Sequence, residues 1–323
     1  MIRSIPFVKG HCGWDVVTLI PADEVPETER LAASLKILDP PVCGGLEVGW
    51  LGRVSDHNEM PISMVSSTAR NWIRMCGGMS QVIGKALVET FLGERLRIRS
   101  AEPELRFELL TPVGRIPVSV EVGGGRCRSV TTSMNAYLTY INREGIESLK
   151  SQGIPILKVG NYAVIEITEL EAAYPGLDFT RRDLGESLIV VNELLRNFAA
   201  MRRLDSATGM LFDDRVEGGG HFRVFPRFHS ADLSAARIPW EFQCGTGGIA
   251  VAVALAAKKR LPTRSGAEPL ILEWGSQRTT PDPYGIRTSR LQLECEGTSV
   301  HKARFSHSVI EILEEGRLHL PSY

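Results

Sequence analysis

Residues 243–255 read QCGTGGIAVAVAL, in which a cysteine precedes a glycine-rich turn and an unbroken apolar run. The apolar run is typical of a buried helix, and the glycines fall in its first turn. A second copy lies at residues 75–90, which read MCGGMSQVIGKALVET. When Cys76 is aligned with Cys244, apolar residues recur at matching offsets in both segments. The repeat predicts two related halves, each with a helix whose first turn carries a thiol.

The composition is that of an ordinary globular protein. The chain has 323 residues, 43% of them apolar and 23% charged, with a formal net charge of -1. This balance suits about two domains and gives no sign of a nucleic-acid or membrane partner. The longest apolar run is shorter than the about 20 residues that span a bilayer, and the N-terminus lacks the apolar core of a signal peptide. We therefore expect a cytoplasmic protein; without CxxC or HExxH motifs, no metal site is expected.

The order of strand-like and helical segments predicts an α+β fold. These segments do not alternate strictly, which argues against a doubly wound parallel sheet. We predict two pseudo-symmetric domains, 1–125 and 126–305, each a mostly antiparallel or mixed sheet around a central helix. The glycine cluster 123–125 marks the expected boundary. A C-terminal strand near 306–323 is expected to return to the first domain.

Further elements are predicted outside the repeat. One helix covers 24–37 with Asp23 as its N-cap, and another covers 181–203 with Thr180 as its N-cap. Both carry apolar residues along one stripe. The segment 95–100, RLRIRS, is predicted as a strand.

The two cysteine-led helices indicate acid–base chemistry at a carbon next to a carboxylate. A helix N-terminus presents unpaired N–H groups and the positive end of the helix dipole, which lower a thiol's pKa and bind a carboxylate. If the two helix ends face each other, one thiolate removes a proton from Cα and the opposite thiol returns one to the other face. Backbone N–H groups of the glycine-rich turns would stabilise the carbanion. The predicted donors are Gly77, Gly78, Gly245, Thr246 and Gly247.

The pair MCGG and QCGTGG resembles the two catalytic motifs of the diaminopimelate epimerase and proline racemase superfamily, whose members use two cysteines and no pyridoxal phosphate. FVKGHCGWDVVTLI, CGGLEVGWLG and VGNYAVIEI also look like family segments, so the resemblance covers most of the chain in patches. TGMLFDD, with the long spacer before the second cysteine, looks most like the histidine racemase branch of opine-type metallophore synthesis. The resemblance implies a diaminopimelate epimerase-like fold and a cofactor-independent amino-acid racemase or epimerase, with Cys76 and Cys244 as the acid–base residues.

The resemblance also implies positions that bind a small amino-acid or related carboxylate substrate. It places a substrate-binding asparagine on Asn161, a turn residue on Trp14 where the family has asparagine, and an arginine on Arg227. Glu47 lies in a predicted strand and is a candidate partner of the substrate's amine. A turn role for Asn161, a packing role for Trp14 and a solvated position for Glu47 are the simpler alternatives. Pro226 replaces the glutamate of a Glu-Arg pair, which disfavours diaminopimelate as substrate.

Other functions stay open at this point. Gly78 stands where the family usually has asparagine or histidine. One alternative is an isomerase or tautomerase that shifts a double bond in an unsaturated carboxylic acid, and another is a binder of an anionic metabolite without turnover. The two retained cysteines favour the two-base reaction, because binding alone needs the N–H groups and not the thiols. Each chain carries both cysteines, so we expect a monomer or a homodimer.

Overall fold

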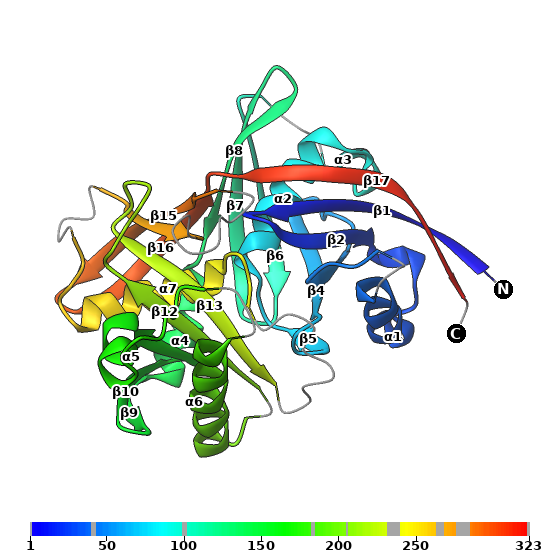
Figure 1. The fold of residues 1–323 in the computed structure, drawn as a ribbon. Helices are drawn as coiled ribbons and strands as arrows, with labels where there is room; N and C mark the ends of the chain where they lie inside the picture. Colours follow the sequence, from blue (N-terminus) through cyan, green and yellow to red (C-terminus); the bar gives the residue numbers. More distant parts are fainter. Residues whose placement is uncertain are drawn as a thin grey trace. The chain divides into compact units, whose positions relative to one another are not determined.

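The computed structural model describes residues 2–39, 43–98, 102–181, 185–204, 206–230, 240–262, 268–275 and 285–321 (Figure 1). The chain divides into two compact units. Unit 1 comprises Met1–Ala136 and Val309–Tyr323, and unit 2 comprises Tyr137–Ser308. The C-terminal strand therefore belongs with the N-terminal part of the chain.

Unit 1 is built on a mixed sheet. Its strands are β1 (Ile2–Cys12), β2 (Asp15–Pro21), β3 (Glu47–Leu51), β4 (Glu59–Ser66), β5 (Asn71–Ile73), β6 (Glu104–Thr111), β7 (Gly114–Gly123), β8 (Arg126–Ser133) and β17 (Ile310–Pro321). They pair in the order β17–β1–β2–β3–β4–β6–β7–β8, and β5 pairs with the end of β4 that β6 leaves free. The pairs β2–β3 and β4–β6 are parallel, and the others are antiparallel.

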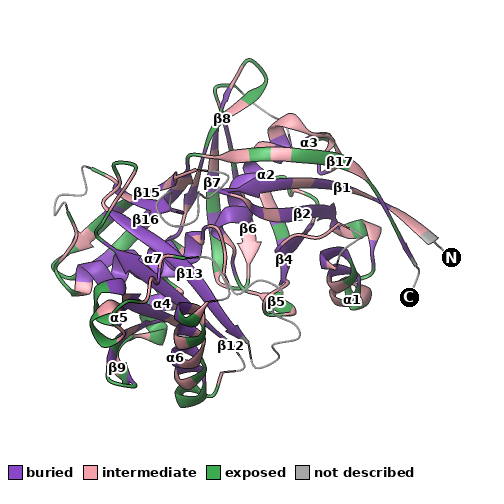
Figure 2. Cartoon of the chain, in the orientation of Figure 1, coloured by how far each residue is buried: buried purple, intermediate pink, exposed green. Residues whose placement is uncertain are grey.

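A helix lies at the centre of unit 1. The helices are α1 (Glu27–Leu38), α2 (Gly77–Glu89) and α3 (Phe91–Arg95), preceded by a short 3-10 turn at Ala22–Glu24. α2 packs against β17, β1 and β2 at one side of the sheet and against β7 and β8 at the other, so the sheet wraps around it. Burial runs along most of its length (Figure 2). Gly84 permits this close packing, because a Cβ there would lie 2.7 Å from Val130 Cγ1.

Unit 2 is also built on a mixed sheet. Its strands are β9 (Ile146–Ser151), β10 (Ile154–Val159), β11 (Tyr162–Glu166), β12 (Ser206–Asp213), β13 (Phe222–Ser230), β14 (Leu270–Trp274), β15 (Arg287–Glu296) and β16 (Ser299–His307). They pair in chain order, with β11–β12 and β13–β14 parallel. The helices are α4 (Asn135–Glu144), which begins at the boundary between the units, α5 (Ile167–Ala173), α6 (Glu186–Arg202) and α7 (Gly245–Ala257).

The two units repeat one arrangement of elements. α7 packs against β10, β11, β12, β15 and β16, so it is the central helix of unit 2 as α2 is of unit 1. α1 connects the parallel strands β2 and β3, and α5 and α6 connect the parallel strands β11 and β12. The predicted α+β class, with a mixed sheet around a cysteine-led helix in each half, is confirmed.

The division between the units differs from the expected boundary. The cluster 123–125 is the turn of the hairpin between β7 and β8, and Gly124 and Gly125 have φ angles of 64° and 70°. Because β8 pairs with β7, it stays in unit 1, and the division falls after Ala136 rather than after residue 125.

Two predicted helix starts are wrong. α1 begins at Glu27 after Pro26, because the Asp23 carboxylate accepts hydrogen bonds from Arg53 and Arg95 instead of capping a helix. α6 begins at Glu186.

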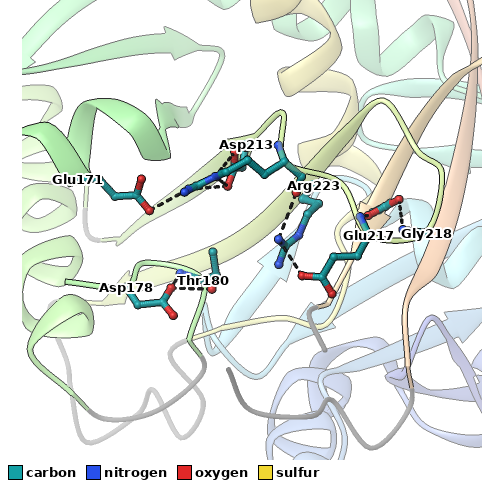
Figure 3. Close-up of polar contacts among 9 residues, drawn as sticks. Glu171, Asp178, Thr180, Asp213, Glu217, Gly218 and Arg223 are labelled. Atoms are coloured by element: carbon teal, nitrogen blue, oxygen red, sulfur yellow. Dashed lines mark hydrogen bonds and ion pairs between the residues drawn. The ribbon is translucent and has the colours of Figure 1, made fainter. Parts of the chain in front are cut away.

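The N-cap predicted for the second of these helices has another partner. Residues 182–184 lie outside the described residues, and the Thr180 hydroxyl donates to Asp178 Oδ1 at 2.6 Å (Figure 3).

The predicted strand 95–100 is also wrong where it is described. Phe91–Arg95 forms α3, and the chain turns at 96–97; residues 99–100 lie outside the described residues. Within the described part of the chain, no helix has the length and apolar character needed to cross a membrane.

Candidate active site

Cys76 is the N-cap of α2. Its Sγ accepts a hydrogen bond from the Met79 N–H at 3.2 Å, and its thiol donates to Glu47 Oε2 at 2.6 Å. Gly77 and Gly78 are the first two residues of the helix, where backbone N–H groups have no intrahelical acceptor. Cys76 is half-buried. The sulfur of Cys76 thus contacts both a carboxyl group and a helix N-terminus.

Glu47 is the first residue of β3 and is buried, with 8% of its surface exposed. Burial raises its pKa to about 7, against the lowering effect of the hydrogen bond from Cys76. Desolvation dominates because an ionised carboxylate loses its hydration in this position. At neutral pH, Glu47 is therefore poised between its neutral and ionised forms, beside a thiol that can exchange a proton with it.

The hairpin turn between β1 and β2 carries Trp14. Trp14 has a φ of 76°, in the left-handed region that bulky residues seldom adopt. Its indole stacks on the His11 imidazole at 4.2 Å between ring centroids, and the backbone N–H of Trp14 donates to His11 Nδ1 at 3.2 Å. His11 therefore carries its hydrogen on Nε2, which lies 3.3 Å from Glu311 Oε2 of β17. These contacts hold the turn in place. They are the packing role that the sequence offered as the alternative to substrate binding for Trp14.

The same end of unit 1 holds a second thiol, that of Cys12. Cys12 is fully buried, and its pKa is raised well above the ordinary value by burial and by the negative charges of Asp15 and Glu47. It is therefore a neutral thiol beside two carboxyl groups.

Cys244 is the N-cap of α7, and its surroundings repeat those of Cys76. Its Sγ accepts from the Gly247 N–H at 3.4 Å and lies 3.5 Å from Thr246 Oγ1. A hydrogen bond also links its thiol to the Glu241 carboxylate. Gly245 and Thr246 are the first two residues of this helix, as Gly77 and Gly78 are of α2. Each cysteine thus combines a helix N-terminus with a glutamate.

The predicted lowering of the thiol pKa is wrong for Cys244. Desolvation and the negative charge of Glu241 raise its pKa well above the ordinary value, although hydrogen bonds from Thr246 and Gly247 act in the opposite direction. Burial of the thiol, together with the carboxylate in contact with the sulfur, outweighs the partial charge of the helix end. Cys244 is therefore held as a neutral thiol.

The role expected for Gly247 also differs. Its N–H bonds the sulfur of Cys244, so it is part of the cap. The absence of a side chain serves packing, because a Cβ would lie 2.4 Å from Met210 Sδ and 3.2 Å from Cys244 Sγ.

Two tyrosines beside Cys244 were missed by sequence reasoning. Tyr162 Oη lies 2.7 Å from Thr246 Oγ1 and 3.9 Å from Cys244 Sγ. Tyr137, which is buried in α4, is hydrogen-bonded to Tyr162. Tyr162 directly follows Asn161 in the quoted segment, so its neighbourhood was signalled; α4 was not predicted, and nothing in the sequence marked Tyr137.

Asn161 lies next to this cluster, in the turn between β10 and β11. It is exposed, and its amide donates to Tyr140 Oη at 3.2 Å. Glu241, three residues before Cys244, was also missed; its spacing within WEFQCGTGG is the signal that a search for nearby acids would have used.

Arg227 of β13 has a different environment from the one expected of a substrate-binding arginine. It is buried, with 2% of its surface exposed, and its guanidinium donates to the carbonyl oxygens of Pro226, Phe179 and Arg181. These contacts tie the loop before α6 to the sheet.

A separate buried network in unit 2 explains the glycines 218–220. The Glu273 carboxylate accepts hydrogen bonds from the N–H groups of Glu217, Gly218 and Gly220 at 2.6 to 2.8 Å. Figure 3 shows Glu217 paired with Arg223, at 2.9 Å. A Cβ on Gly220 would lie 2.6 Å from Glu273 Cγ, so this network needs a glycine there. Among the described residues, no cluster of His, Cys, Asp or Glu is arranged to hold a metal ion.

Comparisons with known proteins identify the fold. No protein-family model and no curated protein sequence matches the chain. Among solved structures, a hydroxyproline epimerase from Agrobacterium vitis with bound trans-4-hydroxy-L-proline is 17% identical, with a TM-score of 0.65 over 98% of this chain and 92% of that one. A probable proline racemase from Agrobacterium radiobacter with bound carbonate is 14% identical, with a TM-score of 0.66 over 98% and 93%.

A third solved structure of this fold belongs to another class of isomerase. A methylitaconate-delta-isomerase is 13% identical, with a TM-score of 0.59 over 99% of this chain and 96% of that one. At these identities the likeness establishes the fold. The chain has the fold that these epimerase, racemase and isomerase structures share.

Proposed function

We propose that the protein is a cofactor-independent amino-acid racemase or epimerase in which Cys76 and Cys244 exchange protons with the two faces of Cα. One observation carries the proposal: each cysteine caps a glycine-led helix, accepts the third N–H of that helix and contacts a glutamate. Binding an anion would need only the N–H groups. A thiol with its own carboxylate is suited to proton transfer.

Each cysteine and its glutamate form one half-site, Cys76 with Glu47 and Cys244 with Glu241. The two half-sites supply the two protonation states that such a reaction needs. Glu47, with a pKa of about 7, can take the proton of Cys76 and leave a thiolate. Cys244 is held as a thiol beside Glu241. In the proposed reaction, the Cys76 thiolate removes the proton from Cα, and the Cys244 thiol donates its proton to the opposite face. The product leaves Cys76 protonated and Cys244 ionised, which is the state that accepts the other enantiomer.

The substrate carboxylate would bind at the helix N-termini. The first two N–H groups of α2 belong to Gly77 and Gly78, and those of α7 belong to Gly245 and Thr246. Proton removal moves negative charge onto the carboxylate oxygens, so donors aimed there stabilise the carbanion more than the substrate. Glu47 and Asn161 remain the candidates for the substrate's amine and polar groups.

Proton exchange at Cα tests this proposal. A panel of free amino acids, 4-hydroxyproline included, is incubated in deuterated water; deuterium at Cα is followed by NMR and configuration by chiral chromatography. We expect one group of amino acids to exchange and invert. Cys76→Ala and Cys244→Ala should each lose inversion by about 10²- to 10⁴-fold, the usual contribution of a positioned acid or base. Each variant should keep exchange with retention for one enantiomer, because a single base serves one face.

Cys127→Ala is the matched control, because that thiol is half-buried in the β7–β8 hairpin and lies outside both half-sites. It should behave as wild type. The proposal fails if no amino acid exchanges its α-proton, or if either single-cysteine variant still inverts Cα at the wild-type rate.

A double-bond isomerase of an unsaturated carboxylic acid is the second candidate, supported by the likeness to methylitaconate-delta-isomerase. This reaction moves a proton between two different carbons. Incubation with allylic dicarboxylic acids would give a product with a shifted double bond, whereas a racemase would return the same connectivity.

A further inference from the structure

We infer that Tyr137, Tyr162 and Thr246 form a chain of hydroxyl groups that ends on Cys244 and controls the reactivity of its sulfur. Thr246 Oγ1 lies 3.5 Å from Cys244 Sγ and 2.7 Å from Tyr162 Oη. The Tyr162 hydroxyl is hydrogen-bonded in turn to Tyr137. The three residues come from α7, β11 and α4, so the chain is assembled by the fold of unit 2.

The two phenols stay neutral under physiological conditions. Desolvation raises the pKa of Tyr137 and of Tyr162 well above the ordinary value. A neutral hydroxyl carries one hydrogen and accepts others, so it can point its hydrogen either toward the sulfur or away from it. Each link of the chain is therefore reversible.

The reversible chain suits a sulfur that must exist as both thiol and thiolate. In the thiol state, Cys244 donates to Glu241. In the thiolate state, the sulfur accepts from the Gly247 N–H and from Thr246, while Thr246 accepts from Tyr162 and Tyr162 from Tyr137. Hydrogen bonds aligned in one direction strengthen one another. The aligned chain thus stabilises the anion that desolvation and Glu241 disfavour.

Cys76 is supported differently. Its thiol contacts Glu47, a carboxylate that can accept the proton itself. Cys244 also has a glutamate, Glu241, but α7 carries Thr246 at the position where α2 has Gly78, so the hydroxyl chain is a feature of Cys244. Its hydroxyl groups supply hydrogen bonds to the ion that remains after the proton has left. We therefore assign Tyr162 and Tyr137 as positioning residues of Cys244. The role of these residues in catalysis rests on the proposed function. Their effect on the reactivity of the Cys244 sulfur does not depend on it.

Alkylation of individual cysteines tests the inference without turnover. The intact protein is treated with iodoacetamide between about pH 7 and about pH 11, a range that extends above the ordinary thiol pKa because that of Cys244 is raised. Peptide mass spectrometry then gives the rate at each cysteine. The groups that titrate around Cys244 are Glu241, Tyr137 and Tyr162. The pH midpoint of the rate reports ionisation of the thiol, and the plateau at high pH reports access, so the midpoint is the decisive value.

Removal of one hydroxyl should raise the midpoint of Cys244. For Tyr162→Phe we expect alkylation below the midpoint to slow about three- to tenfold, which corresponds to one neutral hydrogen bond. Thr246→Val should have a larger effect, because it removes the link that touches the sulfur, and Tyr137→Phe a smaller one. Thr246→Val also tests the chain if Tyr162→Phe folds poorly. The midpoint of Cys76 in the same samples is the internal reference and should not move.

Tyr174→Phe is the matched control, because it also removes a hydroxyl hydrogen-bonded within unit 2, to Gln152 Oε1 at 3.1 Å. An unchanged Cys244 midpoint in Tyr162→Phe and Thr246→Val, or an equal shift in Tyr174→Phe, would overturn the inference. A graded shift in a protein that inverts no amino acid would retain the inference and reject the proposed function. If the protein inverts an amino acid but the Cys244 midpoint does not change in these variants, the proposed function is retained and the inference is rejected.

Discussion

Among single residues, Glu47 ties the charge of the site to the stability of unit 1. Burial raises its pKa from 4.5 to about 7, so the folded chain holds a proton that the unfolded chain releases between these pH values. The folded state is therefore favoured at low pH, and this stability is lost as pH rises through 7.

Glu47→Gln should remove this pH dependence, since the amide is neutral throughout. At about pH 8 we expect the variant to be more stable than wild type by about 1–3 kcal/mol, and the gap should close toward about pH 5. The measurement is the urea midpoint at each pH, and Glu294→Gln serves as the exposed control. A gap for Glu47→Gln that does not change with pH would show that burial does not perturb this carboxyl.

Residue-level features of the site were only partly predictable. The cysteines and the glycines after them could be predicted, because the same cysteine-led helix occurs once in each half of the sequence. The contact of Glu47 with Cys76 joins positions 29 residues apart, and that of Tyr162 with Thr246 joins positions 84 residues apart. Such pairs depend on which strand lies beside which helix. The direction of the Cys244 pKa was predicted wrongly, because a helix N-terminus in the sequence shows neither the burial of the thiol nor its contact with Glu241.

At the scale of elements, α2 depends on a glycine where it crosses β7 and β8. Gly84→Ala would place a Cβ 2.7 Å from Val130 Cγ1 and 3.0 Å from Val120 Cγ2. Alanine gains about 1 kcal/mol of helix propensity over glycine, but β-branched valines on a sheet have little freedom to move. We expect a net loss of about 1–3 kcal/mol, the usual cost of overpacking, measured as a lower urea midpoint.

A second substitution that relieves the clash at Gly84→Ala distinguishes the effect of packing on stability from other effects. Val130→Ala in the Gly84→Ala background should recover part of the loss. Gly248→Ala in α7 is the matched control, because its nearest neighbour is the end of the flexible Leu272 side chain at 3.3 Å, and its loss should be smaller. If Gly84→Ala is as stable as wild type, the helix and sheet can separate there at little cost.

The elements that pattern and propensity predicted are those with strong local signals. The central helices show unbroken apolar faces, and the strands around them alternate. The start of α1 was misplaced because Asp23 is used in ion pairs with residues from β3–β4 and α3, which no local pattern reveals. The segment 95–100 has the alternation of a strand, yet Phe91–Arg95 continues from α2 as a helix capped by Thr90.

At the scale of the whole molecule, β17 completes unit 1 from the far end of the chain. It pairs with β1 from Ile2 to Cys12, and its Glu311 contacts His11 beneath the Trp14 turn. A chain that ends at Ser308 would leave β1 with an unpaired edge, and unit 2 would keep all its strands.

We expect this truncation to remove hydrogen-exchange protection from β1 and β2 while β12 and β13 keep theirs. Peptide-resolved exchange on the full chain and the truncated chain measures it. Equal loss of protection in both units would contradict the division into separately stabilised units.

The return of β17 also sets an order for folding during synthesis. Unit 2 is continuous from Tyr137 to Ser308, so every strand of its sheet has been made before the first residue of β17 leaves the ribosome. Unit 1 begins first but must wait for Val309–Tyr323. The nascent chain therefore carries an open β1 edge until β17 is made, and the surroundings of Cys76 are completed after those of Cys244.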